Sequence, residues 1–462
     1  MPRFTVQDVV RATHGALVGG DLGIPVTGVS VDTRTLRVGE AFFAIKGHHL
    51  DGHAFLAEAA GRGASCLVVH QLPDEVPAGV PVVLVEDTTR ALGRIAGFHR
   101  SRFDIPVVAV TGSNGKTTTK EMTAAVLGTR WSVLKSAASF NNQWGLPLTL
   151  LGLSHEYEAA VLELGANQPG EIAYLAELCR PTVAVVTTVA VVHTEFFKTL
   201  EGVREEKAAL VRAVFEEGSV VLNGDDPRVR AMARDARGRV IVVGLARDAR
   251  VRAVGELQER ADGIGFTLEI DGRRRAVRLA FLGPHNVTNA LASAGAGVAL
   301  GLSLDEIAAG LEAARPLKGR LVWRRAGSIR ILDDTYNANP ASVRAALAAL
   351  APARGAGRLL VALGDMLELG DSAAAAHRDV GRLVAECGAA EFVGVGSLMR
   401  HAAEAARDAG LLESRHVETF QEAVALLLKR LAPGDTLLVK GSRGMRMERV
   451  VDALVARLGG GE

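Results

Sequence analysis

The stretch "TGSNGKTTT" at residues 111–119 combines glycines, a lysine and several hydroxyls, which suits phosphate chemistry. The run before it, "IPVVAV", is β-branched and typical of a buried strand, and the residues from Lys116 onward favour a helix. Glycines let backbone N–H groups approach anionic oxygens, and a helix N-terminus favours negative charge. The stretch therefore predicts a phosphate-binding loop in which Lys116 reaches the β and γ phosphates and Thr117 offers a hydroxyl to Mg²⁺.

This loop departs from the familiar GxxxxGKS/T pattern, because Val110 stands where the first glycine of that pattern would precede Gly115. The structural alternative is an ordinary glycine-rich turn between a strand and a helix. A lysine and a run of threonines in this context favour the phosphate loop over that alternative.

Other polar residues follow later strands. Glu163 ends the apolar run "VLE", where a carboxylate at the carboxyl end of a strand would face the same crevice as the loop and suit Mg²⁺. His193 follows "PTVAVVTTV", although a lone histidine beside an apolar run is more often structural. Lys207, in "EGVREEKAALVRAV", has the local pattern of a lysine on a helix surface. Near the last third of the chain, Arg320 lies in "PLKGRL" and Asp334 in "ILDDTYNANP".

The composition limits the classes of partner. The 462 residues are 48% hydrophobic, enough for several buried cores, and 53 basic residues balance 52 acidic ones to a net charge of +1. This balance gives no electrostatic footprint for nucleic acid or an acidic membrane, so small-molecule partners are expected. Three separated cysteines disfavour a zinc site or a disulfide framework, and no signal peptide or spanning segment is apparent. We expect a cytoplasmic protein.

The alternation of strands and helices predicts an α/β protein of three domains. Residues 1–102 mix short strands with a helix near 53–62 and form a small N-terminal α/β module. Residues 103–314 alternate strands and helices into a mostly parallel sheet, with a hairpin over 264–281 turning at Asp271-Gly272 and an Asn-capped helix in "GPHNVTNALAS". Residues 315–462 repeat the alternation as a Rossmann-like domain, but they lack GxGxxG, so no NAD is predicted.

These pieces together resemble the Mur ligases, which join an amino acid or dipeptide to a UDP-linked muramoyl precursor of peptidoglycan. "TGSNGKTTTKEM" looks like their phosphate loop, and "GPHNVTNALAS" is similar to their adenine-contacting stretch. "SVDTRTLRVGEAFFAIKG" resembles a uridine-nucleotide module. The dipeptide-adding branch resembles the chain most closely, through "SFNNQWGLPLTLL", "LELGANQPGEI", "DDTYNANPASVRAAL", "GDMLELG" with His377 following, and "LVKGSRGMRME".

The resemblance implies an ATP-dependent ligase that adds D-alanyl-D-alanine to UDP-muramoyl-tripeptide, with Mg²⁺ as cofactor, carbamylation of Lys207, and a monomeric state. The residues that it assigns to ATP are Thr111, Gly112, Asn114, Gly115, Lys116, Thr117, Thr118, Asn286, Asn289, Arg320 and Asp334, with Lys116, Lys207 and His193 as catalytic residues. It assigns Mg²⁺ to Thr117, Glu163, His193 and the carbamate of Lys207. It assigns the UDP substrate to Ser30, Asp32, Arg34, Lys46, Gly47, Asp51, His53, Asn141 and Asn142, and the dipeptide to Tyr336, Asn337 and Asn339.

The chain also departs from the family pattern. Thr188 and Ala190 replace residues of an Asn-Ile-Gly-like run, and Ser139 stands where an asparagine is common, which bears on substrate fit. Two alternatives remain within the superfamily: a ligase that adds a single amino acid, and a folylpolyglutamate-type ligase. A nucleotide-dependent scaffold without ligase activity is a third, of another class. The sequence leaves open whether the third residue of the peptide is lysine or diaminopimelate.

Overall fold

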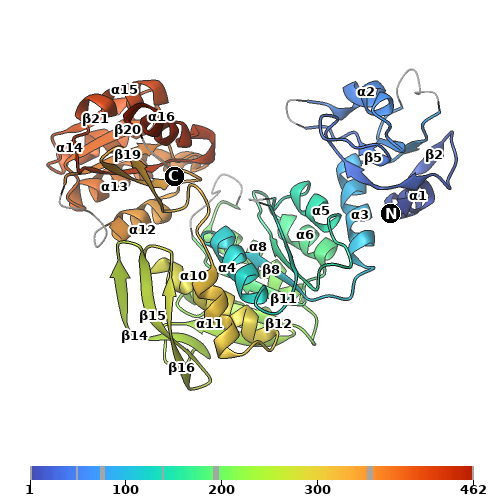
Figure 1. Cartoon of the computed structure of the whole chain (residues 1–462), viewed down its shortest axis with the longest axis horizontal. Helices are drawn as coiled ribbons and strands as arrows, with labels where there is room; N and C mark the ends of the chain where they lie inside the picture. The colour runs from blue at the N-terminus through green and yellow to red at the C-terminus, as the bar shows by residue number, and fades with distance from the viewer. Residues whose placement is uncertain are drawn as a thin grey trace. The chain divides into compact units, whose positions relative to one another are not determined.

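The computed structural model of the protein describes residues 3–47, 50–72, 79–137, 140–190, 197–350 and 357–459. The chain divides into two compact units. Figure 1 colours the chain by residue number, from blue at the N-terminus to red at the C-terminus. The first unit holds residues 1–109, 131–166 and 170–182, and the second holds 110–130, 167–169 and 183–462. In the described parts of the chain, no helix combines the length and apolarity needed to span a bilayer.

The first unit begins with a small α/β module. Its sheet has the order β2-β7-β6-β5-β4, with parallel pairing except between β2 and β7. The strands are β2 (Ala16–Val18), β4 (Gly28–Ser30), β5 (Glu40–Phe43), β6 (Cys66–Val69) and β7 (Val82–Leu84), and β1 (Phe4–Thr5) pairs separately with β3 (Pro25–Val26). The helices are α1 (Val6–Thr13), α2 (Leu56–Gly61) and α3 (Thr88–Arg100). Buried Phe42 and Leu67 belong to the core of this module.

The first unit also holds the parallel pair β9 (Val133–Lys135) and β10 (Ala159–Glu163), with helices α5 (Gly145–Leu150) and α6 (Glu171–Cys179). The strand β8 (Val107–Thr111) crosses from one unit to the other, and its last two residues belong to the second. All five residues of β8 and all five of β10 are buried, as expected for strands covered on both faces.

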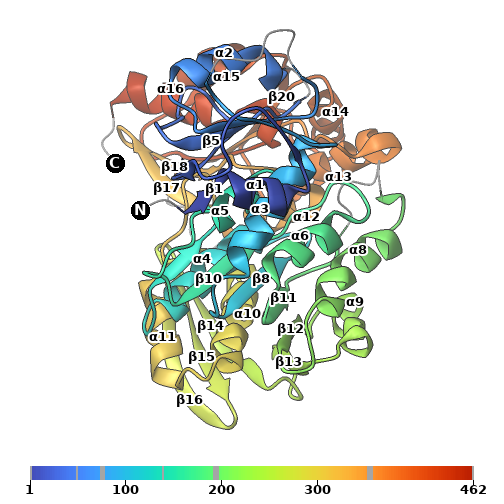
Figure 2. The same cartoon turned by 90° about the vertical axis from the view of Figure 1, so that its right-hand side faces the viewer.

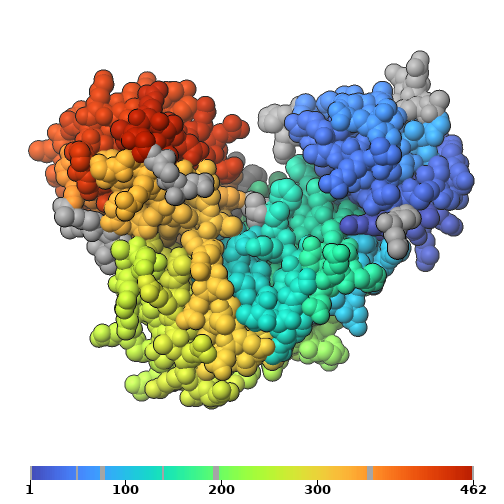
Figure 3. Space-filling view, in the orientation of Figure 1, coloured from blue at the N-terminus to red at the C-terminus, as the bar shows by residue number. Residues whose placement is uncertain are grey.

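The central part of the second unit is built on the parallel strands β11 (Val183–Val186), β12 (Ser219–Asn223) and β13 (Arg239–Gly244). An extension follows, in which β14 (Val251–Arg260) pairs antiparallel with β15 (Gly263–Ile270), and β15 with β16 (Arg273–Leu279). The helices here are α4 (Lys116–Leu127), α8 (Leu200–Arg212), α9 (Pro227–Ala231), α10 (His285–Ala299) and α11 (Leu304–Ala313). Figure 3 shows the extension at the molecular surface, in agreement with the exposed residues of β14 and β16.

The C-terminal part of the second unit is a three-layer α/β/α arrangement. Its described sheet has the order β17-β18-β22-β19-β20-β21, parallel except for β17 at the edge. The strands are β17 (Val322–Ala326), β18 (Ile329–Asp334), β19 (Leu359–Gly364), β20 (Glu391–Val395), β21 (Ser414–Val417) and β22 (Thr436–Lys440). One apolar cluster joins the sheet to α12 (Pro340–Leu350), α13 (Ala373–Glu386) and α14 (Met399–Asp408), and another joins it to α15 (Phe420–Arg430) and α16 (Glu448–Leu458). Figures 1 and 2 show these helices around the sheet.

The predicted fold class is confirmed: the protein is α/β, with mostly parallel sheets and a Rossmann-like C-terminal part. The hairpin is also confirmed, because Asp271 and Gly272 form its turn with φ of 49° and 80°. The Asn-capped helix is wrong: α10 begins at His285 after Pro284, and no side chain caps it. Asn286 therefore lies inside the helix.

Candidate active site

The phosphate loop has the predicted strand-loop-helix form. β8 ends at Thr111, Gly112 and Gly115 adopt φ of 145° and 82°, and α4 begins at Lys116. Nζ of Lys116 donates to the carbonyl oxygen of Gly112 at 2.7 Å, so its ammonium group lies over the loop. The helix N-terminus and the ammonium group together make the loop a cradle for anions.

The loop glycines are required by close neighbours as well as by their φ angles. A Cβ atom on Gly112 would collide with the hydroxyl of Thr187, and one on Gly115 would collide with the side-chain oxygen of Asn289. Gly115 therefore lets α4 and α10 approach each other at the point where the loop turns into the helix.

We expect Gly115→Ala to weaken binding of an ATP analogue by about tenfold or more, because the left-handed conformation costs about 1–2 kcal/mol and Asn289 must also move. Isothermal titration measures the change. Gly170→Ala is the matched control: Gly170 also precedes a helix, with φ of 90°, but nothing lies near its added Cβ. An equal loss of affinity in Gly170→Ala, which lies outside the loop, would contradict the specific role of Gly115.

Two threonines that follow β11, Thr187 and Thr188, hold the phosphate loop in place by hydrogen bonds. Oγ1 of Thr187 donates to the carbonyl oxygen of Asn114 at 2.6 Å, and the N–H of Asn114 donates to Oγ1 of Thr188 at 3.1 Å. The N–H of Ser113 donates to the carbonyl oxygen of Thr188 at 2.8 Å. Sequence reasoning related Thr188 to substrate fit, and it missed both threonines as partners of the loop. Two hydroxyls at the end of a buried strand were the available signal.

The helix α10 presents Asn286 and Asn289 toward the loop, and both are buried. Nδ2 of Asn289 donates to Oδ1 of Asn286 at 2.9 Å, and Asn286 donates in turn to the carbonyl oxygen of Leu282 at 2.8 Å. Oδ1 of Asn289 accepts from Thr119 in α4 at 3.3 Å. These amides thus join α10 to the phosphate-loop helix, and their contact with adenine stays a prediction.

Arg320 reaches the same loop from the segment before β17. Its Nη2 donates to Oγ1 of Thr117 at 2.8 Å, and its guanidinium carbon lies 4.0 Å from the ring centre of Tyr336. The structure thus brings together Arg320 and Thr117, which the sequence assigned to ATP, and Tyr336, which it assigned to the dipeptide.

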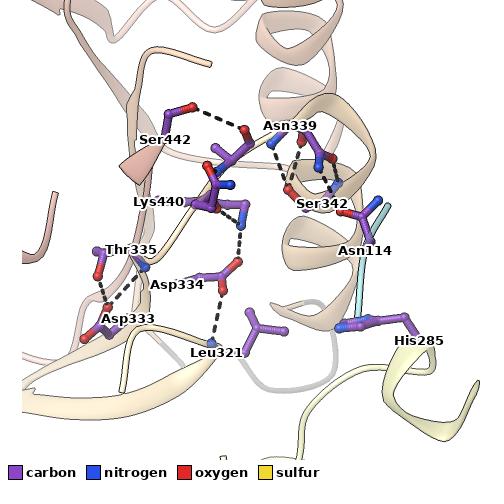
Figure 4. Close-up of polar contacts among 12 residues, drawn as sticks. Asn114, His285, Leu321, Asp333, Asp334, Thr335, Asn339, Ser342, Lys440 and Ser442 are labelled. Atoms are coloured by element: carbon purple, nitrogen blue, oxygen red, sulfur yellow. Dashed lines mark hydrogen bonds and ion pairs between the residues drawn. The ribbon is translucent and has the colours of Figure 1, made fainter. Parts of the chain in front are cut away.

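Asp334 lies at the end of β18 in a buried ion pair. Its Oδ2 accepts from Nζ of Lys440 at 2.5 Å, and its Oδ1 accepts from the N–H of Leu321 at 3.2 Å. Figure 4 shows Lys440 beside Asp334. Lys440 also donates to the carbonyl oxygen of Asn337 at 2.8 Å. The pair ties β22, the Asp334–Asn337 loop and the segment carrying Arg320 to one another. Lys440 was missed as a site residue.

The remaining two residues assigned to the dipeptide follow Asp334 on the same loop. Oδ1 of Asn337 accepts from the N–H of Arg443 at 3.3 Å, which holds the loop against the segment after β22. Nδ2 of Asn339 donates to Oδ1 of Asn114 in the phosphate loop at 2.8 Å. Their contact with a dipeptide stays a prediction.

The residues assigned to Mg²⁺ are only partly described. Glu163 is buried, and its Oε1 accepts from Nδ2 of Asn141 at 2.8 Å; its Oε2 is buried and has no hydrogen-bond partner among the residues that the structure describes. An orphaned carboxylate oxygen fits a hard cation such as Mg²⁺. His193 lies outside the described residues. Within the described ranges, no three His, Cys, Asp or Glu side chains gather as a metal cluster.

Lys207 differs from its local sequence pattern. The charged neighbourhood favoured a surface lysine, but the side chain is 2% exposed in α8, and its Nζ lies 5.8 Å from the ring centre of Phe197. The interpretation of Lys207 as a lysine on the helix surface is therefore wrong.

In the N-terminal module, the residues assigned to uridine form two local networks. Arg34 binds the carboxylate of Asp32 with both Nε and Nη2, and this pairing lowers the pKa of Asp32 to about 2. The hydroxyl of Ser30 accepts from the N–H of Asp32 at 3.2 Å. Oδ1 of Asp51 lies 2.7 Å from Nδ1 of His53, and Nε2 of His53 accepts from the N–H of His70 at 3.2 Å.

Lys46 and Gly47 lie beside Asp51, because Lys46 forms an isolated β-bridge with it and the N–H of Gly47 donates to the carbonyl oxygen of Leu50 at 2.8 Å. Oδ1 of Asn142 accepts from the N–H of Gly145, the first residue of α5, at 2.9 Å. For these residues, as for Asn141, the structure shows local roles, and uridine binding stays a prediction.

His377, in the stretch that resembled the family, is a structural residue here. Its Nε2 accepts from the N–H of Met366 at 3.1 Å, and its Nδ1 lies 2.7 Å from the carbonyl oxygen of Ala373. Because Nε2 accepts from an N–H, the other ring nitrogen, Nδ1, is the one placed to donate to Ala373; burial lowers the pKa of His377.

We expect His377 to reduce stability in acid. The unfolded imidazole, with a pKa of about 6.5, takes up a proton before the folded one, so its stabilisation is present above this pH and is lost as the pH falls toward the lower folded pKa. Thermal unfolding from about pH 8 to 5 should therefore show a steeper decline for the wild type than for His377→Asn. The pKa values of buried His99 and half-buried His285 are lowered in the same direction, so the difference between the two slopes is the measure. Equal slopes would contradict the assignment.

Comparison with known proteins covers nearly the whole chain. Residues 25–100 match the family model described as "Mur ligase family, catalytic domain", residues 110–297 the "Mur ligase middle domain", and residues 319–443 the "Mur ligase, glutamate ligase domain". The UDP-N-acetylmuramoyl-tripeptide–D-alanyl-D-alanine ligase of Escherichia coli (strain K12) is 37% identical over 468 residues, covering 98% of this chain and 99% of that protein.

Solved structures agree. A crystal structure of MurF from Acinetobacter baumannii superposes with a TM-score of 0.90 at 32% identity, covering 99% of each chain. MurF ligase from Thermotoga maritima in complex with ADP gives a TM-score of 0.82 at 27% identity, covering 93% of this chain and 97% of that one. Because these matches extend through every part of the fold described above, the phosphate loop included, the chain belongs to the Mur ligase family.

Proposed function

We propose that this chain joins D-alanyl-D-alanine to the tripeptide of UDP-N-acetylmuramoyl-tripeptide in an ATP-driven reaction. As a Mur ligase, the chain is an ATP-binding enzyme that forms carbon–nitrogen bonds. The observation that carries the proposal is the phosphate loop around Lys116, which Arg320 and Asn339 of the C-terminal domain contact directly. The full-length similarity to ligases named for the dipeptide supports this substrate over a single amino acid or a folate.

The chemistry follows from the acceptor. A carboxylate is a poor acylating agent, so the terminal carboxylate of the tripeptide attacks the γ-phosphate of ATP and forms an acyl phosphate with release of ADP. The free amine of the dipeptide then attacks the acyl carbon, and phosphate leaves through a tetrahedral intermediate. Lys116 and the N–H groups of the glycine loop stabilise the negative charge as it moves between oxygens.

The metal and carbamate assignments belong to this proposal. We assign Mg²⁺ to the hydroxyl of Thr117, the orphaned oxygen of Glu163, His193, and Lys207 as its carbamate. A bound Mg²⁺ neutralises charge on the transferred phosphoryl group. Carbamylation would turn the buried cation of Lys207 into a carboxylate on a long arm, and its burial is the feature that supports the assignment.

The three domains would divide the work. We assign residues 1–102 to the uridine nucleotide, residues 103–314 to ATP, and residues 315–462 to the dipeptide and part of ATP. All of these partners are small molecules. A monomer in the cytoplasm remains our prediction.

The test is a product assay. Purified protein is mixed with ATP, Mg²⁺, UDP-muramoyl-tripeptide and D-alanyl-D-alanine, and the pentapeptide is measured by mass spectrometry together with phosphate release. We expect both to depend on the dipeptide. If phosphate were released at the same rate with and without the dipeptide, and no pentapeptide formed, the proposed function would be overturned.

A further inference from the structure

We propose that Asn339 is a positioning residue for ATP, because its side-chain amide holds the phosphate loop through Asn114. The two residues are 225 positions apart, and Nδ2 of Asn339 donates to Oδ1 of Asn114 at 2.8 Å (Figure 4). The inference rests on the proposed use of the loop for ATP and goes beyond it, since it makes the loop's geometry depend on the C-terminal domain.

Asn114 is the residue through which a second domain can act on the loop. Its N–H and its carbonyl oxygen are already held by Thr188 and Thr187. The main chain is therefore fixed from the side of β11, and the side chain is the part that meets the C-terminal domain. Since the loop's backbone N–H groups must point at phosphate oxygens, a small displacement of Asn114 would misdirect them.

Asn339 is itself oriented by a short network at the start of α12. Its Oδ1 accepts from the N–H of Ser342 at 2.8 Å, and its own N–H donates to the hydroxyl of Ser342 at 2.9 Å. Because Oδ1 accepts from a backbone N–H, the other end of the amide must be the donor, and this end faces Asn114. Figure 4 shows both sets of contacts.

A purely structural role for Asn339 would be that of a helix cap. Serine caps a helix about as well as asparagine does, but its hydroxyl is too short to replace the amide's reach. Asn339→Ser therefore preserves the cap and removes the contact with Asn114. If capping were the whole role, this variant would bind ATP like the wild type.

The experiment is a double-mutant cycle on the full-length protein, with a non-hydrolysable ATP analogue and Mg²⁺ in isothermal titration. We expect Asn339→Ser to weaken binding by about three- to tenfold, as for the loss of one neutral hydrogen bond, with an unchanged melting temperature. In the Asn114→Ala background, Asn339→Ser should change binding by less than about twofold, because its partner is already absent.

Two further variants sharpen the test. Ser342→Ala keeps the N–H that holds Oδ1 of Asn339 and removes only the hydroxyl that binds the main chain of Asn339, so a smaller loss of affinity is expected. Ser303→Ala removes the cap of α11 in the same unit and should lower the melting temperature without changing ATP binding.

Unchanged binding by Asn339→Ser, or fold-changes that simply multiply in the double variant, would overturn the inference while leaving the proposed function intact. A wild-type protein that binds no ATP analogue would instead overturn the proposed function.

Discussion

Lys116→Ala is expected to reduce pentapeptide formation by about a thousandfold or more, since a preorganised group that stabilises transition-state charge typically contributes that much. The ammonium group lies over the loop, with Nζ 2.7 Å from the carbonyl oxygen of Gly112. Alanine is compatible with the first turn of α4, so the fold should be kept. The measurement is the initial rate of dipeptide-dependent phosphate release, together with the melting temperature.

Two controls frame this result. Lys429→Ala removes an exposed lysine from the last turn of α15 and should leave the rate unchanged. Lys116→Arg keeps the charge but changes its shape, and we expect it to remain strongly impaired, because a guanidinium does not reproduce the compact point charge of an ammonium group. Full activity of Lys116→Ala would show that the loop takes no part in catalysis. The alternative of a nucleotide-dependent scaffold would then be tested by measuring the binding of a partner protein.

Lys207→Ala is expected to lower activity by about a hundredfold, the upper range of the effect of losing a metal-supporting group. Short carboxylic acids such as formate or acetate should restore part of the rate, because each supplies the carboxylate that the carbamate would provide. The side chain is 2% exposed, so its loss also leaves a cavity. The melting temperature therefore has to be measured beside the rate.

The rescue separates the two roles of Lys207. If it served only in packing, carboxylic acids would restore nothing, and Lys207→Met, which fills similar volume, would be nearly active. A carbamylated lysine predicts the opposite: Lys207→Met is as impaired as Lys207→Ala, and the rate of the wild type depends on bicarbonate. Full activity of Lys207→Ala would show that the metal assignment there is wrong.

Local signals predicted much of the fold. β-branched runs such as "VVAVT" are buried along their whole length, and the Asp271-Gly272 dipeptide has the positive φ angles of a hairpin turn. The missed elements lacked such signals. β17 has the sequence "VWRRA" and lies at the edge of its sheet, where charged residues are common. Its two arginines interrupt the run of apolar residues by which a strand is predicted. The helices α1 and α3 begin at Val6 and Thr88 and were not predicted. Their N-caps are Thr5 and Asp87, residue types that are also common in turns and loops.

The site was predicted where a motif is contiguous and was missed where contacts join distant residues. Asp334 and Lys440 are register partners on β18 and β22, a pairing that depends on strand order rather than on spacing. The burial of Lys207 likewise follows from tertiary packing, which the charged residues around it concealed. The amide of Asn339 meets the phosphate loop only because α12 begins beside it.

The stacking of Arg320 on Tyr336 has a consequence for the cost of binding. A free arginine side chain samples many rotamers, and holding it in one rotamer against a phosphate costs about 2 kcal/mol of side-chain conformational entropy. Here the ring and the hydroxyl of Thr117 already restrict the guanidinium before any ligand arrives. In the proposed site, where Arg320 holds the nucleotide, Tyr336 would thus lower the entropic penalty of binding and strengthen affinity without itself touching the nucleotide.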